Sequence, residues 1–446
     1  MAKDKKAAKE LTMEEKLAQA FVPVEEQPYK IPENWCWTTI DKVTYHISDG
    51  SHNPPINSEK GIPLLSAANI HNGIIDFESA NRWITEKDWE YANKRTKIEL
   101  NDVLVTIVAT IGRVAIVKSN KKFALQRSVA VLKPIINSDF LAYYLESPFV
   151  QSFMTNNAKG TAQKGFYLKT LAQMPCIIAP TTEQQCIVDH IKSIFAKLDE
   201  AKEKAQAVVD SFELRKSAIL HKAFTGELTK QWRDEHGLTL ESWKKTKLGD
   251  TIRLLSGQDF KPEQYNNKND GVPYITGASN FDETHVVINR WTSVPSVIAK
   301  KGDILLVCKG SGYGKTIIAD FEEAHIARQI MAIRTNDNII NEYLLFYFQA
   351  QYEYFRNNGK GLIPGISRKV VLEMQVRLPT KNEQVYIVEQ VKSILNKEIL
   401  AREAAKKVID QINIIKQAVL TRAFHGELGT NDPTEEAAIE LLKLAL

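Results

Sequence analysis

A long segment near the middle of the chain recurs near its end, and this repeat limits the possible folds more than any other feature. The first copy spans residues 183–228 and the second spans residues 383–428, so equivalent positions are 200 residues apart. Both copies begin with Glu-Gln and end with Gly-Glu-Leu. Two copies at so long a period do not make a solenoid. The repeat therefore indicates a duplicated half-molecule.

Each copy has the apolar spacing of a long helix, with steps that alternate between four and three residues. Gly226 and Gly426 follow the last apolar turn, where a helix-ending glycine is expected. About 40 residues of helix would extend roughly 60 Å. We predict two long helices that pack against each other; the alternative is that each helix packs only on its own domain. The predicted contact residues are Ile187, Ile191, Ile194, Leu198, Val208 and Phe212 in the first copy, and Ile387, Val391, Ile394, Val408, Ile412 and Ile415 in the second.

The segments before each helix have short strands, turns and short helices, which predicts an α+β fold with two globular domains. Residues 271–275 repeat the Gly-x-Pro pattern of residues 61–65, although the loops between such matched points differ. We predict a short N-terminal helical extension (1–28), a first domain (29–180), the first long helix (181–228), a connector with a second domain (229–378), the second long helix (379–428) and a short terminal helix (429–446).

Composition restricts the functional class only loosely. The 446 residues are 43% hydrophobic and 25% charged, with a net charge of +4, so nucleic-acid binding would need a local basic surface. The sequence has no apolar run long enough to span a membrane, and its N-terminal lysines precede no apolar segment of a secretory signal. Four scattered cysteines are typical of reduced thiols. These features predict a cytoplasmic protein.

Two stretches resemble catalytic motifs but do not complete them. Residues 53–56 read Asn-Pro-Pro-Ile, whereas adenine methyltransferases have an aromatic residue at the fourth position. Residues 310–316 resemble a P-loop, but its first glycine is replaced by Lys309. The histidines and cysteines have no metal-ligand spacing. We therefore predict no catalytic residue, no metal site and no cofactor bound by this chain.

Basic and amide side chains recur on glycine-rich loops at corresponding places in both domains. Such side chains hold phosphates and read base edges, so we consider them candidates for DNA binding. The alternative is that loops are polar in any soluble protein. The candidates are Lys60, Arg113, Gln126, Arg127, Lys159, Gln163 and Lys164 in the first domain, and Lys261, Lys309, Ser311, Lys315, Arg328, Gln329, Lys360 and Arg368 in the second.

The repeat, the helix starts Pro-Thr-Thr-Glu-Gln-Gln and Pro-Thr-Lys-Asn-Glu-Gln, and the Phe-x-Gly-Glu-Leu endings together resemble the specificity subunit of Type I restriction-modification systems. The resemblance covers about residues 28–428. It implies two target-recognition domains, separated by two antiparallel helices and related by a pseudo-twofold axis. Each domain would read one half of a split double-stranded DNA site, and the helices would set the spacer and dock the modification subunits.

The same resemblance implies that catalysis belongs to partner proteins. Modification subunits, two in number, would bind S-adenosylmethionine and methylate adenine, and restriction subunits attached through them would use ATP and Mg. Two alternatives stay open on the residues alone. One is a DNA-modifying or DNA-cleaving enzyme with an unrecognised site, and the other is a coiled-coil scaffold without a DNA role.

Overall fold

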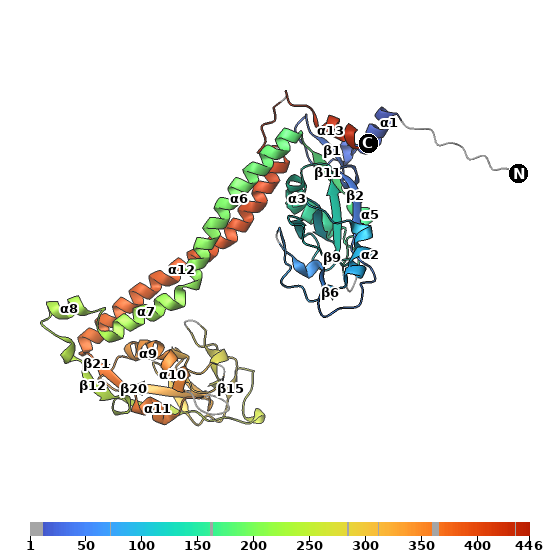
Figure 1. Ribbon diagram of the computed structural model, residues 1–446. Coiled ribbons are helices and arrows are strands. Elements are labelled where there is room, and N and C mark those ends of the chain that lie inside the picture. Colours follow the sequence, from blue (N-terminus) through green and yellow to red (C-terminus); the bar gives the residue numbers. More distant parts are fainter. Residues whose placement is uncertain are drawn as a thin grey trace. The chain divides into compact units, whose positions relative to one another are not determined.

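The computed structural model describes residues 12–71, 73–160, 164–282, 285–310, 312–358, 365–432 and 434–446 (Figure 1). Contacts between residues divide the chain into two compact units. Unit 1 consists of Met1–Lys204 and Val408–Leu446, and unit 2 consists of Ala205–Lys407. Each unit therefore combines one mixed α+β domain with a part of each long helix. Among the described residues, no helix is both long and apolar enough to cross a membrane.

Domain 1, the globular part of unit 1, is built on an antiparallel sheet of order β2-β10-β7-β8. Its inner strand β7 is buried at every position because helices and strands cover both faces. Val103 and Val105 face the core that contains α3, whereas Leu104 faces the opposite core. The elements are α1 (Met13–Ala20), β1 (Cys36–Thr39), β2 (Thr44–Asp49), β3 (Ile62–Leu65), β4 (Ile70–His71), β5 (Ile74–Ile75), β6 (Trp83–Ile84), α2 (Glu86–Thr96), β7 (Val103–Thr106), β8 (Val114–Ile116), β9 (Ala124–Leu125), β10 (Val129–Pro134), α3 (Ser138–Glu146), α4 (Pro148–Asn156), α5 (Leu168–Ala172), β11 (Pro175–Ile178) and α13 (Ala438–Ala445).

Domain 2, the globular part of unit 2, repeats this arrangement with the sheet order β13-β20-β17-β18. In both domains a second sheet contains one parallel pair, β3 with β9 in domain 1 and β14 with β19 in domain 2. The elements are α8 (Lys230–Glu235), β12 (Lys244–Lys247), β13 (Ile252–Ser256), β14 (Val272–Ile275), β15 (Trp291–Thr292), β16 (Ile298–Lys300), β17 (Ile304–Val307), β18 (Thr316–Ile318), β19 (Glu323–Ile326), β20 (Ile330–Thr335), α9 (Asn341–Ala350), α10 (Tyr352–Asn358), α11 (Arg368–Glu373) and β21 (Gln375–Leu378).

The second repeat forms one helix, α12 (Lys381–Phe424), but the first is interrupted at Ser211 and forms α6 (Thr181–Asp210) and α7 (Phe212–Thr225). The prediction of a single helix for the first copy was therefore wrong. The Ser211 hydroxyl donates to the carbonyl of Ala207, a bond that tends to bend helices. Arg215 adds to the distortion, since its Nη2 donates to the Val208 carbonyl at 3.1 Å.

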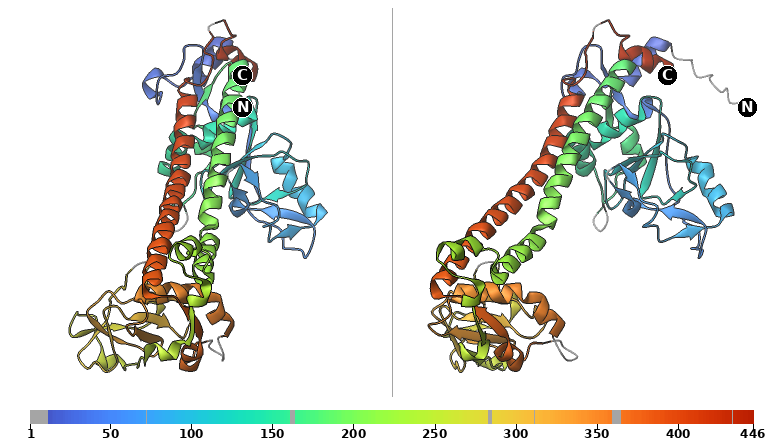
Figure 2. Two further views of the ribbon diagram at one scale, coloured as in Figure 1. Left: turned by 90° about the vertical axis from the view of Figure 1, so that its left-hand side faces the viewer. Right: turned by 60° about the vertical axis from the view of Figure 1, so that its left-hand side comes forward.

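Within unit 1, parts of α6 and α12 lie side by side in all views (Figures 1 and 2). His190 Nδ1 lies 2.7 Å from the Leu428 carbonyl oxygen, and Lys416 Nζ lies 2.6 Å from Asp199 Oδ1. Residue numbers that rise on one helix fall on the other, so the two helices run antiparallel in this unit.

Within unit 2, the helices are likewise antiparallel. Arg215 Nε donates to Glu398 Oε2 at 2.6 Å, and the Arg402 guanidinium lies 4.2 Å from the Phe212 ring centroid. The first contact also explains why the apolar pattern is broken at Glu398. In the other copy of the repeat, Glu398 corresponds to Leu198 and Arg215 corresponds to Ile415, and both of these residues are apolar. A charged pair thus occurs in one half where two apolar residues occur in the other.

Burial of the predicted contact residues is strongest near the domains. Ile187, Ile191, Ile387 and Val391 are fully buried, Phe212 and Ile412 are also buried, and Ile194, Leu198, Val208 and Ile394 are partly buried.

The prediction was wrong for Val408 and Ile415, whose side chains are 40% and 44% exposed. In this stretch of α12 the predicted contact residue Ile412 is buried, and so is Ala405. An α-helix has 3.6 residues per turn, so it drifts away from a seven-residue seam by about 20° per heptad. Because of this drift, the apolar positions Ala405 and Ile412 stay buried, whereas Val408 and Ile415 turn toward solvent.

In each unit, aromatic side chains of the domain pack against a phenylalanine near the end of one copy of the repeat. Phe224 packs edge-on against Tyr343 and Tyr347 of α9, with ring centroids 5.2 and 5.4 Å apart. Its repeat counterpart Phe424 packs in the same way against two aromatic residues of α3, both at 5.3 Å. The prediction that the helices derive from a duplication thus extends to the contacts that they make within each unit.

The glutamines at the helix starts make matched hydrogen bonds. Gln184 Oε1 accepts from the backbone N–H of Asn137 at 3.0 Å, and Gln384 Oε1 accepts from that of Ile340 at 3.0 Å. Both glutamines are buried. A buried amide needs its partners, so this residue at the second position of each Glu-Gln pair fixes the loop before α3 or α9 on its long helix.

Candidate nucleic-acid interface

In domain 1, the turn after β9 lies against the turn after β2. The backbone N–H of Ser51 donates to the Leu125 carbonyl at 2.7 Å, and that of Arg127 donates to the Ser51 carbonyl at 3.1 Å. A Cβ at Gly50 would lie only 2.2 Å from the Leu125 oxygen, so glycine is required for this approach. The arrangement presents Arg127 to solvent and leaves Gln126 partly buried beside it.

Domain 2 builds the same pair of turns with different side chains. A Cβ at Gly257 would lie 2.1 Å from the Ala327 carbonyl oxygen. Arg328, the counterpart of Arg127, is exposed, and its Nε lies 2.6 Å from Asp259 Oδ2. Gln329 follows it and is exposed. A shared frame thus holds a positively charged residue at the same place in each domain, with neighbours that differ.

A second pair of loops lies next to the connection between the third and fourth strands of each main sheet. In domain 1, Lys159 and Gly165 exchange backbone hydrogen bonds of 2.8 and 2.9 Å, and Val108 pairs with Gly165. Lys159 and Lys164 are exposed there. In domain 2, exposed Lys309 pairs with Gly365 in the equivalent way.

Two of the residues predicted to bind DNA make hydrogen bonds within their own domain. Arg113 is partly buried and its Nη1 lies 3.3 Å from both the Ile70 carbonyl and His71 Nδ1. Arg368 donates from Nη1 to the Leu254 carbonyl at 3.0 Å and to Ser256 Oγ at 2.9 Å, so its guanidinium braces strand β13. The remaining described candidates, Lys60, Lys261 and Lys315, are exposed on turns. Gln163, Ser311 and Lys360 lie outside the described residues.

Two buried asparagines that the sequence analysis missed hold the loops after β3 and β14. Asn69 Oδ1 accepts from the Ser66 backbone N–H at 2.9 Å, and Asn280 Oδ1 accepts from that of Thr276 at 2.9 Å. Both asparagines are almost inaccessible to solvent. The signal that would have found them is their shared place, shortly after the Gly-x-Pro strand of each domain.

His325 in β19 is another residue that sequence reasoning missed. Its Nδ1 accepts from the Val297 backbone N–H at 3.1 Å, and its Nε2 donates to the Gln258 carbonyl at 2.8 Å. Burial lowers the pKa of His325 below its ordinary value. The neutral ring therefore serves as a structural support beneath the turn that carries Arg328.

The segment that resembles a P-loop is a turn between the antiparallel strands β17 and β18. Gly310 and Gly314 both have positive φ, at 88° and 90°. The segment leads into a strand rather than a helix, so it lacks the helix N-terminus that binds phosphate in a P-loop. In the part of the chain that the structure describes, no group of three or more His, Cys, Asp or Glu side chains is arranged to hold a metal ion.

Comparison with known proteins supports the expected relationship. The family model described as "Type I restriction modification DNA specificity domain" matches residues 51–209 and 240–411. The chain is 33% identical over 221 residues to the Type I restriction enzyme EcoBI specificity subunit of Escherichia coli, covering 48% of this chain and 46% of that protein. It is 22% identical over 432 residues to the EcoKI specificity subunit of Escherichia coli K12, covering 90% of each.

Solved structures share the fold. The HsdS subunit from Thermoanaerobacter tengcongensis aligns with a TM-score of 0.60 and 20% identity, covering 91% of this chain and 100% of that one. A chain from a structure of a type I R-M system, described under complex assembly and conformational transition, aligns with a TM-score of 0.71 and 19% identity, covering 90% and 100%. At these identities the likeness concerns the fold alone.

Proposed function

This chain belongs to the Type I restriction-modification DNA specificity family, and we propose that each of its two domains reads one half of a split DNA site. One observation carries the proposal. The framework residues of the two domains match, whereas the side chains on equivalent loops differ, as at the turns of Arg127 and Arg328. A duplicated frame with diverged loops is expected when each domain must recognise different bases.

The chain is a recognition subunit and not itself an enzyme, and DNA is its partner. Exposed lysines and arginines on the loops would contact phosphates and place each domain on the duplex. A few side chains at base edges in the grooves would then select the sequence. Divergence of the loops would change the contacts with base edges, while the contacts with phosphates would be retained.

We propose that the long helices act as a ruler and as the dock for two modification subunits. A helix of 44 residues, such as α12, is about 66 Å long, which is nearly two turns of B-DNA. S-adenosylmethionine would be bound by the modification subunits, and ATP and Mg by restriction subunits attached through them. Helix positions are repeated closely, which suits a partner that binds both halves alike.

Co-expression with the cognate modification subunit, followed by sequencing of methylated adenines in host DNA, tests this function. We expect one bipartite motif with a fixed spacer. A single continuous motif, or methylation without sequence preference, would contradict two-domain recognition. Binding of S-adenosylmethionine by the isolated chain would instead favour an enzyme.

A further inference from the structure

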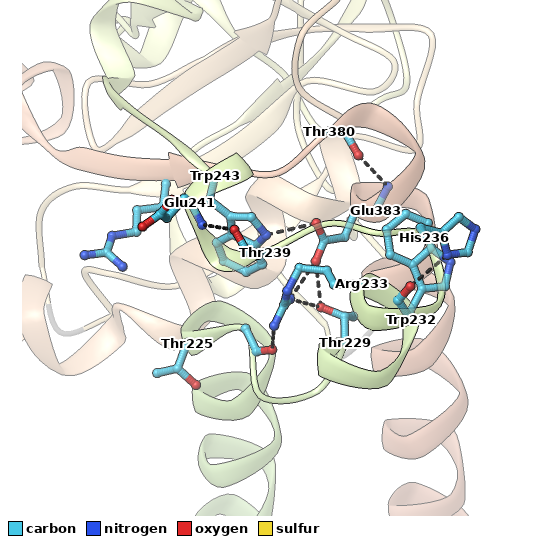
Figure 3. Close-up of polar contacts among 12 residues, drawn as sticks. Thr225, Thr229, Trp232, Arg233, His236, Thr239, Glu241, Trp243, Thr380 and Glu383 are labelled. Carbon is cyan, nitrogen blue, oxygen red and sulfur yellow. Dashed lines mark hydrogen bonds and ion pairs between the residues drawn. The ribbon is translucent and has the colours of Figure 1, made fainter.

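A buried ion pair lies where α12 begins, within unit 2. Glu383 is fully buried, and its carboxylate accepts from Arg233 Nη1 at 2.7 Å, from Thr229 Oγ1 at 2.8 Å and from Trp243 Nε1 at 2.9 Å (Figure 3). Arg233 is only 5% exposed. We call Gly226, Thr229, Arg233, Trp243 and Glu383 the Glu383 joint.

The Glu383 joint connects segments that are far apart in the sequence. Besides Glu383, Arg233 donates to Thr229 Oγ1 at 2.7 Å and to the Gly226 carbonyl at the end of α7. Trp243 precedes β12, where domain 2 begins. The guanidinium therefore ties together both long helices and the connector, while the tryptophan ties them to the domain. Figure 3 shows Arg233 between Thr229 and Glu383.

The geometry of the joint leaves little freedom. Gly226 has a φ of +82°, and a Cβ there would lie 2.5 Å from Leu240 Cδ1 and 3.2 Å from Arg233 Nη2. The Trp243 ring centroid lies 5.6 Å from Arg233 Cζ. A buried ion pair adds little net stability because both charges lose their hydration, but its fixed geometry favours one arrangement of the groups that it joins.

The equivalent site in unit 1 is built differently. Glu183 is also fully buried, but among the described residues its donors are the backbone N–H of Asn431 at 3.1 Å and the Asn34 amide at 3.5 Å. Gly429 occupies the position of Thr229 in the repeat. Trp35, which precedes β1, has a buried indole N–H that finds no hydrogen-bond partner in the part of the chain that the structure describes. The duplication thus retained the glutamate, but among the described residues an arginine bonds to it only at the joint of domain 2.

From this asymmetry we propose that the Arg233–Glu383 pair is a positioning element that fixes the angle of domain 2 on its helices and thereby makes the complex selective for one spacer length. A rotation of about 10° displaces a loop about 20 Å from the joint by about 3.5 Å, which is about one base-pair step. Small rotations at the joint would therefore permit spacers one base pair too short or too long. The inference rests on the proposed function.

The test uses the full chain co-expressed with the modification subunit and a plasmid library that holds the half-sites fixed and varies the spacer. Glu383→Gln and Arg233→Met alone each leave a buried group without its partner and lower the stability of the chain. The double variant Glu383→Gln/Arg233→Met removes both charges, so folding is retained while the ion pair is lost. Arg233→Lys retains the charge but not the fork.

We expect the double variant to methylate spacers one base pair away from the optimum, with spacer discrimination reduced about five-fold or more and unchanged half-site sequences. Arg233→Lys should have a smaller effect in the same direction. Glu183→Gln is the matched control; because no charged donor bonds to Glu183 among the described residues, a glutamine carbonyl can still accept from the closer donor, the Asn431 N–H, and the wild-type spacer preference should persist. A variant that is merely less stable would lose methylation equally at every spacer.

The inference is overturned if both the double variant and Arg233→Lys retain the spacer preference of the wild type, or if Glu183→Gln broadens it equally. In either case a bipartite motif in the wild type would leave the proposed function intact. A wild type without a bipartite motif would overturn the proposed function itself and this inference with it.

Discussion

Glu146 and Gln349 show how the two halves of the chain diverged at single residues. Tyr144 and Tyr347 donate through their hydroxyls to the carbonyls of Pro175 and a residue of β21, both at 2.8 Å, which makes α3 and α9 equivalent. Glu146 faces a cavity of about 720 Å³ in unit 1, lined also by basic side chains, whereas its counterpart carries no charge. Burial raises the pKa of Glu146 to about 7, and nearby Lys416 opposes that rise.

This pKa predicts a pH-dependent stability for unit 1. The folded state keeps the proton on Glu146 up to about pH 7, whereas the unfolded chain loses it above the ordinary value of 4.5. Stability therefore falls as the pH rises from 4.5 through 7. Glu146→Gln should stabilise the unit by about 1–3 kcal/mol at pH 8 and have little effect at pH 5. Thermal unfolding at both pH values measures this.

The exposed Glu86→Gln, at a surface ion pair with Lys122, is the control and should show no such difference. Equal stabilisation by Glu146→Gln at pH 5 and pH 8 would mean that the carboxyl titrates normally.

Lys159 and Lys164 belong to the loops that we assign to phosphate contacts. Replacing both by glutamine should weaken binding of the assembled complex to DNA and reduce the slope of log affinity against log salt concentration by about 1–2, because each phosphate contact releases a counterion. Base preference should not change. Binding titrations at several salt concentrations provide the measurement. Lys197→Gln on α6 should leave the slope unaltered, and an unaltered slope in the double variant would exclude phosphate contacts at this loop.

At the level of elements, the spacing of apolar residues predicted the long helices, but it did not predict the interruption of the first helix, which depends on polar contacts. Ile187 and Ile387 were found because a helix packed along one side repeats its apolar residues every three or four positions. The interruption at Ser211 depends on hydrogen bonds donated by its hydroxyl and by Arg215. The hydropathy of the sequence does not show such bonds.

The residues proposed for the nucleic-acid interface also differ in how the structure places them. Arg127 and Arg328 were selected as basic side chains at corresponding places on loops of the two domains, and both are exposed in the structure. Arg368 was selected by residue type, yet its guanidinium is bonded to Leu254 and Ser256. Residue type and loop position cannot show whether a side chain points to solvent or to its own domain, since neighbouring strands far away in sequence decide it.

The helices permit a prediction about spacer length. Deleting seven matched residues from each helix, 202–208 and 402–408, should preserve the heptad register and shorten the pair by about 10 Å. If the helices act as a ruler, the spacer should shorten by about three base pairs, with both half-sites unchanged. Sequencing of methylated DNA gives the spacer directly. A wild-type spacer in the deletion variant would show that something other than helix length sets it.

For the whole molecule, the essential point is that each unit has its own core, its own aromatic contacts to the long helices and its own loops. Phe224 and Phe424 make equivalent contacts, and so do Gln184 and Gln384. A domain can therefore be replaced without altering the contacts by which the other domain is held. Modularity follows from duplication because each half retained a complete set of framework residues.

Exchange of residues 243–378 with the corresponding segment of a family member tests this modularity. Trp243 directly precedes β12 and Leu378 is the last residue of β21, and these two strands pair with each other and close domain 2. Since domain 1 and both long helices stay unchanged, the hybrid should recognise one new half-site and retain the other half-site and the spacer. Methylome sequencing of cells that express the hybrid with the modification subunit gives the motif. A change in both half-sites would show that the domains do not read DNA independently.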